Sequence, residues 1–497
     1  MLFNSYIFLF AFLPVTWVAF RVGCKAKDSR LSIHILAVAS LVFYSYWNPK
    51  FVCLIFASIV FNYLISSQLR PPASSLRITT KRRKLILSFG IIVNLGGILY
   101  FKYSNFFIGS IADIAGFQYS HRDIFLPLGI SFFTFQQIAY LVDCYKGIVQ
   151  RQVGFVHYLL FVSFFPQLIA GPIVHHSDVM PQFMSPKHRP LDYENLVWGV
   201  SMITLGLFKK VVIADTFSPW VAAAFDSNQI LTLLEAWTGT LSYCLQIYFD
   251  FSGYCDMAIG IGYLFNISLP TNFNSPYKAC SIVDFWRRWH ITLSVFLRDY
   301  LYIPLGGNRK GKSRRYINIL ITMLLGGLWH GAGWTFIFWG FLHGIFICIN
   351  HLWRKLSELL KIRLPKAICW VITFAAVNFA WVFFRSLSYE RAVSISKSML
   401  GLNGFVLGTN KLSESAVAFL SKLGIQVYKP DNWTIESPEQ INMLVLALLI
   451  CLILPNSRQW VEKLNYGKYC WAFCMAVAFF VAINFMDRIS EFLYFQF

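Results

Sequence analysis

Apolar runs of about 20 residues, separated by short basic loops, set the strongest limit on how this chain can fold. An apolar helix of that length crosses a bilayer and satisfies all of its own backbone hydrogen bonds. Only 13% of the 497 residues are charged, and the mean hydropathy is +0.56. A soluble protein carries about 25% charged residues. The sequence therefore predicts an all-α polytopic membrane protein with about twelve transmembrane helices.

The basic residues indicate how these helices are oriented. The formal net charge is +20, and Lys and Arg gather in short loops, such as those after the first, third and fifth apolar runs. The positive-inside rule places these loops in the cytoplasm and both termini outside it. No basic face with base-reading side chains is present, so the expected surroundings are the lipid bilayer, and no nucleic acid partner is expected. The eleven cysteines lie mainly in apolar runs, which favours small buried side chains over a disulfide framework, and no His or Cys with metal-site spacing lies near Cys470 and Cys474.

Two apolar segments do not match simple crossing helices. Phe155–Val174 contains Pro166 and the Gly171–Pro172 pair, and both of its flanks look cytoplasmic. We therefore expect a re-entrant segment, which is tolerated only inside protein or beside water. Leu231–Phe265 is too long for one straight crossing, and we expect Gly253 to break it.

The longest polar segment covers residues of about 386–440, and alternation places it outside the cytoplasm. This external loop has room to receive a partner. We see no separate soluble domain and no internal repeat, so residues 1–497 are predicted to form a single transmembrane domain.

A histidine lies inside the apolar run Leu324–Trp339. His330 follows Trp329, and four glycines surround it: Gly326, Gly327, Gly331 and Gly333. An ionisable side chain at membrane depth costs roughly 2.5 kcal/mol or more, so it marks a functional site by default. Glycines weaken a helix and let a substrate or a neighbouring backbone come close. A neutral histidine hydrogen-bonded between packed helices is the other interpretation. The glycines favour a reaction centre, at or near a turn between two helices.

Two further polar features lie earlier in the chain. Asp250 is a carboxylate within an apolar run, and it either orders a polar active-site network or is a paired structural carboxylate. The segment Asp284–Tyr300 is predicted to be one amphipathic helix of about 17 residues. Its polar face would carry Arg287, His290, Ser294 and Arg298, and its apolar face Trp286, Trp289, Leu293, Phe296 and Tyr300. This helix either lies at the cytoplasmic interface or turns its polar face toward a cavity in the protein.

These motifs resemble those of the membrane-bound O-acyltransferase family, and most closely its bacterial alginate O-acetyltransferase branch. The resemblance rests on residues 246–344, above all QIYFDFSGYCDMAIGIGYLF, NFNSPY, DFWRRWHITLSVFLRDYLYIPLGGNRKG and GGLWHGAGWTFIFWGFLHG. It implies a spiral of membrane helices, with re-entrant and amphipathic helices, around a tunnel. It also implies that the WHG histidine, here His330, is essential, and that the RWH histidine, here His290, is the second functional position. The amphipathic segment then belongs to the tunnel wall.

Acyl transfer from a thioester to a hydroxyl requires that the hydroxyl lose its proton, and histidine suits that role. We expect His330 to be the general base and His290 to polarise the carbonyl or shuttle the proton. Arg287 or backbone N–H groups are candidates for the oxyanion, and the cytoplasmic arginines suit coenzyme A phosphates. Asp250, Trp329 and Ser294 are the other candidate substrate-binding residues. A covalent acyl-histidine intermediate remains an alternative.

The resemblance implies an inner-membrane O-acetyltransferase. It would move an acetyl group from a cytoplasmic thioester, such as acetyl-CoA, to hydroxyls of an extracytoplasmic, alginate-like polysaccharide. Periplasmic acetyltransferase proteins are the expected partners. No permanently bound cofactor is expected. One set of alternatives changes the acceptor: peptidoglycan, or D-alanyl transfer as in teichoic acid synthesis. Another is a non-catalytic acyl relay or transporter that feeds a periplasmic transferase.

Overall fold

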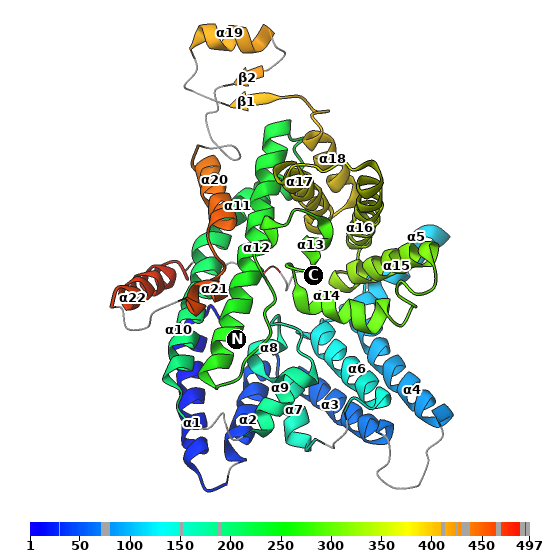
Figure 1. The fold of residues 1–497 in the computed structure, drawn as a ribbon, viewed down its shortest axis with the longest axis vertical. Coiled ribbons are helices and arrows are strands. Elements are labelled where there is room, and N and C mark those ends of the chain that lie inside the picture. The colour runs from blue at the N-terminus through cyan, green and yellow to red at the C-terminus, as the bar shows by residue number, and fades with distance from the viewer. Residues whose placement is uncertain are drawn as a thin grey trace. The chain divides into compact units, whose positions relative to one another are not determined.

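The computed structural model describes residues 1–28, 30–70, 80–149, 153–185, 190–408, 413–422, 426–428, 438–463, 469–487 and 493 (Figure 1). Nearly all regular structure in these ranges is helical. The described strands, β1 (Val406–Gly408) and β2 (Gln426–Tyr428), pair in parallel with Val406 opposite Gln426. The predicted all-α class is confirmed.

Six helical stretches in the described ranges are long and apolar enough to cross a membrane. They are Phe8–Lys25, Lys50–Leu69, Thr80–Ala115, Tyr193–Phe225, Trp334–Leu360 and Lys366–Arg385. Shorter apolar helices cover Leu31–Ser45, Glu439–Ile453 and Tyr469–Asn484. The chain is therefore a multi-pass membrane protein, while the number of about twelve crossings and the orientation of the termini stay predictions.

The chain forms two compact units, and the first comprises Met1–Leu207, Tyr254–Asn272 and Val461–Phe480. Its helices are η1 (Phe8–Phe12), α1 (Leu13–Lys25), α2 (Leu31–Ser45), α3 (Lys50–Leu69), α4 (Thr80–Ile98), η2 (Leu99–Tyr103), α5 (Ser104–Ala115), α6 (Ile130–Lys146), α7 (Phe155–Ser163), α8 (Phe165–Leu168), α9 (His176–Met184) and α10 (Tyr193–Phe208), with the second part of α12 (Leu233–Leu264), the end of α21 (Ser457–Glu462) and most of α22 (Tyr469–Asn484). Within this unit α1 packs on α2, α2 on α7, and α4 on α6.

The first unit holds the segment predicted to be re-entrant. Phe155–Val174 forms α7 and α8, of nine and four residues, followed by irregular backbone, and residues 158–174 are all buried. Neither helix is long enough to cross a bilayer. Gly129, at the start of α6, has φ 70°, and a Cβ there would lie 2.7 Å from the Leu168 carbonyl oxygen. The turn before α6 therefore packs directly on the end of α8.

The second unit comprises Phe208–Gly253, Phe273–Trp460 and Val481–Phe497. Its elements are η4 (Lys209–Ala214), α11 (Asp215–Phe225), the first part of α12 (Leu233–Leu264), η5 (Pro276–Lys278), α13 (Ile282–Trp286), α14 (Ile291–Leu297), η6 (Arg298–Tyr302), α15 (Lys312–His330), α16 (Trp334–Leu360), α17 (Lys366–Arg385), α18 (Tyr389–Met399), β1, α19 (Glu414–Lys422), β2 and α20 (Pro438–Ile453). Parts of the predicted external loop, 409–412, 423–425 and 429–437, lie outside the described residues.

The expected break at Gly253 is wrong. Helix α12 runs without interruption from Leu233 to Leu264, 32 residues in all. The length rule assumes a straight crossing along the bilayer normal, whereas a longer helix can tilt or extend beyond the hydrocarbon. A single glycine weakens a helix by only about 1 kcal/mol, which burial of the surrounding side chains overrides.

Helices α15 and α16 pack closely on each other as a hairpin in the second unit. A Cβ on Gly327 would lie 2.3 Å from the Phe336 carbonyl oxygen, and one on Gly340 would lie 2.3 Å from the Met323 carbonyl oxygen. The two helix backbones therefore touch, as small residues permit in membrane proteins. The turn between them covers residues 331–333, which confirms the predicted turn beside His330.

Candidate active site

His330 is the last residue of α15, and its side chain is buried inside a ring of aromatic residues. The centroid of its imidazole lies 4.8 Å from that of Trp329, 5.0 Å from that of Trp339 and 5.1 Å from that of Phe384. These rings come from α15, α16 and α17. Helices α15, α16 and α17 thus hold the imidazole in a buried, aromatic setting.

His290 reaches the same place from a different element. Its ring centroid lies 6.4 Å from that of His330, 6.1 Å from that of Trp329 and 4.9 Å from that of Phe251. The side chain is fully buried. Burial lowers the pKa of His290 from 6.5 to about 3, so the ring is neutral at physiological pH. The two histidines singled out by the sequence are therefore neighbours in space.

The single amphipathic helix expected over Asp284–Tyr300 is wrong. The segment is split into α13 and α14, and His290, between them, has the left-handed backbone angles φ 42° and ψ 56°. A non-glycine residue held there stores about 1–3 kcal/mol of strain, and such strain clusters at functional sites. Because of the break, His290 leaves the polar face on which helical spacing had placed it.

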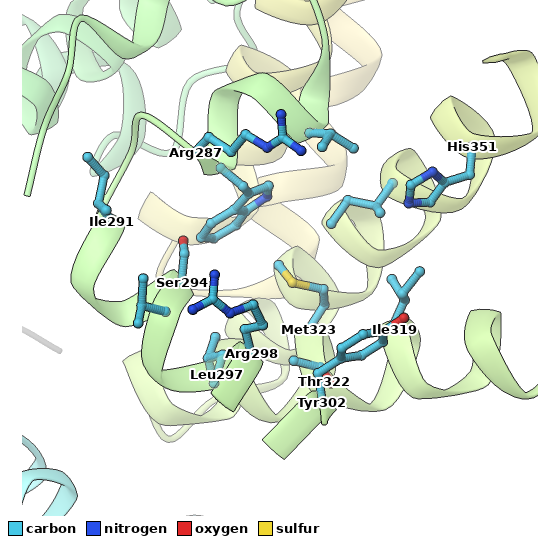
Figure 2. A pocket seen from close by; sticks show the side chains of 14 residues that line it. Arg287, Ile291, Ser294, Leu297, Arg298, Tyr302, Ile319, Thr322, Met323 and His351 are labelled. Atoms are coloured by element: carbon cyan, nitrogen blue, oxygen red, sulfur yellow. The ribbon is translucent and has the colours of Figure 1, made fainter. Parts of the chain in front are cut away.

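The other residues of the predicted polar face, Arg287, Ser294 and Arg298, line a pocket of about 570 Å³ (Figure 2). Arg287 follows α13, Ser294 lies on α14 and Arg298 begins η6. In Figure 2 Ser294 and Arg298 lie near each other, Arg287 lies above them, and His351 lies on the right. The opposite walls come from α15 and α16, and they include Ile319, Thr322, Met323 and Ile347. Trp286, expected on the other face of the helix, also lines this pocket.

The two arginines of this pocket differ in their partners. Arg298 bonds both carboxylate oxygens of Asp299, at 2.6 and 2.9 Å. Arg287 makes no ion pair within the described part of the chain, and it is exposed to solvent. An arginine without a carboxylate partner is the better candidate for an anionic group such as a phosphate.

The pocket is connected to His330 through two indoles. Trp286 lines the pocket, and its ring centroid lies 5.9 Å from that of Trp339. Trp339 in turn lies 5.0 Å from His330, as measured between ring centroids. Ile291, which also lines the pocket, is the neighbour of His290 in the chain. Two indoles, Trp286 and Trp339, therefore separate a ligand in the pocket from His330, whereas His290 is linked to the pocket by its chain neighbour Ile291.

Asp250, the predicted carboxylate at depth, forms a buried ion pair. Lys210 Nζ lies 2.7 Å from Asp250 Oδ1 and 2.8 Å from Asp215 Oδ1. The backbone N–H of Leu493 donates to Asp250 Oδ2 at 3.2 Å. Asp250 does not line the pocket described above. The geometry matches the paired carboxylate named as one of its two interpretations, although Phe251, next in the chain, touches His290.

A third buried histidine was missed by the sequence reasoning. His343 lies on α16 and is fully buried, and its Nδ1 accepts a hydrogen bond of 3.3 Å from the indole Nε1–H of Trp286. Its ring also lies 4.8 Å from that of Trp339. The signal was present, because His343 is an ionisable residue within an apolar run, as His330 is. The described residues contain no cluster of His, Cys, Asp and Glu that could hold a metal ion.

The known proteins that this chain resembles transfer acyl groups, as the sequence motifs predict. The model of the MBOAT, membrane-bound O-acyltransferase family matches residues 148–389. A peptidoglycan O-acetyltransferase of Helicobacter pylori is 43% identical over 524 residues, which cover 100% of this chain and 98% of that protein. A probable alginate O-acetylase AlgI of Pseudomonas aeruginosa is 42% identical, over 90% of this chain and 80% of its own. A teichoic acid D-alanyltransferase of Bacillus subtilis is 30% identical over 52% of this chain and 68% of its own.

Proposed function

Because the chain belongs to the membrane-bound O-acyltransferase family and is an acyltransferase, we propose that it moves an acetyl group from a thioester to hydroxyls of an extracytoplasmic glycan. One observation carries the proposal. Two buried histidines, His290 and His330, meet at 6.4 Å between ring centroids, beside a pocket that holds two arginines. Histidine is the usual general base for deprotonating a hydroxyl near neutral pH.

In the proposed reaction, His330 takes the proton of the acceptor hydroxyl. The oxygen then attacks the thioester carbonyl carbon, and a new C–O bond forms. The C–S bond breaks, and the leaving sulfur takes the proton from His330 as a thiol. The neutral ring of His290 polarises the carbonyl or passes the proton on. A positioned general base of this kind contributes about 10² to 10⁴-fold in rate.

The donor in this proposal is acetyl-CoA or a similar thioester. The pocket offers Arg287 for phosphate groups, beside Arg298 paired with Asp299, and apolar side chains for the thioester arm. Residues 306–315, at the end of the loop after η6 and in the first turn of α15, carry five Lys and Arg residues, which by the positive-inside rule favours a cytoplasmic opening. The donor would then enter from the cytoplasm, and the chain would lie in the inner membrane. No permanently bound cofactor is needed for this chemistry.

Two acceptors are proposed, an alginate-like exopolysaccharide and peptidoglycan. Similarity to the Helicobacter pylori peptidoglycan O-acetyltransferase covers nearly the full length of both chains, whereas similarity to the Pseudomonas aeruginosa alginate O-acetylase covers 80% of the latter. The difference in coverage favours peptidoglycan. Periplasmic partner proteins remain part of the proposal, and the external loop of residues 386–440 is where we would expect them.

The test is donor turnover by purified protein in detergent, with radiolabelled acetyl-CoA and muropeptide or oligoalginate as acceptors. We expect thiol release and labelled ester with one acceptor, and a loss of about 10² to 10⁴-fold for His330→Ala. Ile349→Val, at an exposed position of α16, is the matched control and keeps wild-type turnover. Binding of acetyl-CoA without thiol release, until a periplasmic protein is added, would instead identify a relay. Normal turnover by a folded His330→Ala protein would end the catalytic assignment.

A further inference from the structure

We infer that His343 binds a carbonyl oxygen of the acyl donor through its Nε2–H group. The inference rests on the proposed function, because it assumes a thioester donor in the pocket beside Trp286. It adds a residue to the site whose role follows from one hydrogen bond and from its place on α16.

The hydrogen bond to Trp286 fixes the tautomer of His343. An indole N–H can only donate, so the ring nitrogen that faces it, Nδ1 of His343, must carry a lone pair. A neutral imidazole has one protonated nitrogen, and here that is Nε2. A protonated imidazole, with two N–H groups, could not accept this bond. Trp286 therefore holds His343 as a neutral ring with an N–H donor at Nε2.

This donor has no acceptor among the described residues. The Nε2 atom is buried and makes no hydrogen bond there. The rings around His343 belong to Phe285, Trp286, Trp339, Phe346 and Trp381, with centroids 4.8 to 6.4 Å from its own. None of these side chains offers a strong acceptor. Buried donors are nearly always paired in native proteins, so an acceptor brought by a ligand is the expected partner.

The position of His343 on α16 indicates which ligand brings that acceptor. His343, Ile347 and His351 follow one another at intervals of four residues, so they share one face of the helix. Ile347 and His351 line the pocket proposed for the donor, and so does Trp286, the partner of His343. His343 does not itself line this pocket, but it lies one helical turn from Ile347 on the same face of α16 and contacts the lining residue Trp286.

A thioester donor of the coenzyme A type has only a few acceptors deep in its arm. These are the thioester carbonyl oxygen and the amide carbonyl oxygens of the pantetheine chain. Both are neutral oxygens, which a neutral N–H donor in an apolar cage can bind without a buried charge. The shared chemistry is a carbonyl oxygen, and the two sources can be told apart by ligand analogues.

The test uses variants that separate the two nitrogens of the ring. His343→Gln places an amide NH2 near the former Nε2, whereas His343→Asn places an amide oxygen near the former Nδ1 and loses the outer donor. His343→Phe keeps a ring but has no donor. We expect the Asn and Phe variants to lose about tenfold or more in donor affinity, the value of one hydrogen bond, and the Gln variant to retain most of it. Ile349→Val serves again as the control.

Two unreactive ligands identify the carbonyl. S-(2-oxopropyl)-CoA keeps a ketone near the thioester position, and S-ethyl-CoA lacks it. If the Asn and Phe variants lose affinity only for S-(2-oxopropyl)-CoA, His343 binds the thioester carbonyl. If they lose affinity equally for both ligands, His343 binds an amide carbonyl of the pantetheine chain. Wild-type affinity for both ligands in folded Asn and Phe variants would overturn the inference. Failure of the wild-type protein to bind either ligand would instead overturn the proposed donor, and with it the function on which the inference rests.

Discussion

The imidazoles of His290 and His330 lie 6.4 Å apart between ring centroids, although one residue begins α14 in a left-handed conformation and the other ends α15. Two unrelated local structures thus bring two ionisable rings into one aromatic enclosure. Rings at this distance and tilted by 61° are in edge contact, so we expect the two histidines to act together.

The first prediction concerns these two histidines. We expect His330→Ala to lower kcat/KM for thiol release by about 10² to 10⁴-fold, and His290→Ala to lower it by less. The double variant should fall little below His330→Ala alone, because residues that act together are non-additive. Steady-state kinetics of the single and double variants measure this. If the loss of kcat/KM in the double variant equals the product of the two single-variant losses, the two histidines act independently.

The second prediction concerns the pH dependence of stability. Burial holds the pKa of His290 at about 3, against 6.5 for an exposed ring. Between these values the unfolded chain binds a proton that the folded chain excludes. The stabilising contribution is therefore complete above pH 6.5 and is lost as the pH falls toward 3, at up to about 1.4 kcal/mol per pH unit.

A non-titrating variant tests this. Asparagine tolerates left-handed backbone angles, so His290→Asn keeps the turn before α14. We expect the apparent unfolding temperature of the variant in detergent to fall less than that of the wild type between pH 7 and pH 5. Curves with the same pH dependence would contradict the buried, neutral state of His290.

The third prediction separates the two arginines of the pocket. Arg287→Gln should raise KM for acetyl-CoA by about 10 to 100-fold, as loss of a charge-assisted hydrogen bond implies. Arg298→Gln should have a smaller effect, because Asp299 already pairs with that guanidinium. Acetyl-pantetheine, which lacks the nucleotide phosphates, is the control substrate, and its KM should not change. The same rise for both substrates would remove the phosphate role.

The fourth prediction concerns the crossing of α15 and α16. A Cβ on Gly327 would meet a backbone oxygen at 2.3 Å, so Gly327→Ala forces the helices apart and should cost about 1 to 3 kcal/mol. Gly97→Ala, on α4 with nothing within 4 Å of the added carbon, is the matched control. We expect a lower thermal unfolding temperature for the first variant only. Equal temperatures would mean that the hairpin is not closely packed.

The fifth prediction decides between the two interpretations of Asp250. Its pair with Lys210 is buried, and removing one partner of a buried pair costs about 3 to 5 kcal/mol. Asp250→Asn should therefore lower thermal stability while turnover per folded molecule stays close to that of the wild type. Loss of turnover at unchanged stability would place Asp250 in the active-site network instead.

Several features of the site could be predicted from the sequence. His330 was found because an ionisable residue in an apolar run is rare, and its position at a turn followed from the glycines after it. In the structure, Gly327 before His330 and Gly331 after it allow residues of α16 to pack closely against α15 and the turn. His343 satisfied the same rule as His330, but Leu342 precedes it where Trp329 precedes His330, and it was overlooked.

The course of Asp284–Tyr300 could not be predicted in the same way. Helical spacing assumes that every residue keeps helical backbone angles, and a histidine gives no warning of a left-handed conformation as glycine does. At the break, the His290 ring contacts Phe251 and Trp329, which are distant in sequence and which helical spacing cannot take into account. In the same way, burial along α12 overrode the weakening effect of Gly253.

The backbone contact between Gly327 and Gly340 has a consequence for substrate range. The two backbones are in direct contact there, so smaller side chains at the crossing cannot widen the space around the hairpin that carries His330 and His343. Accommodation of longer or bulkier acyl chains must then come from smaller residues in place of the indoles, such as Trp339 and Trp381, which stack 5.8 Å apart between centroids. Selectivity for chain length can in this way diverge among enzymes while the reacting centre stays fixed.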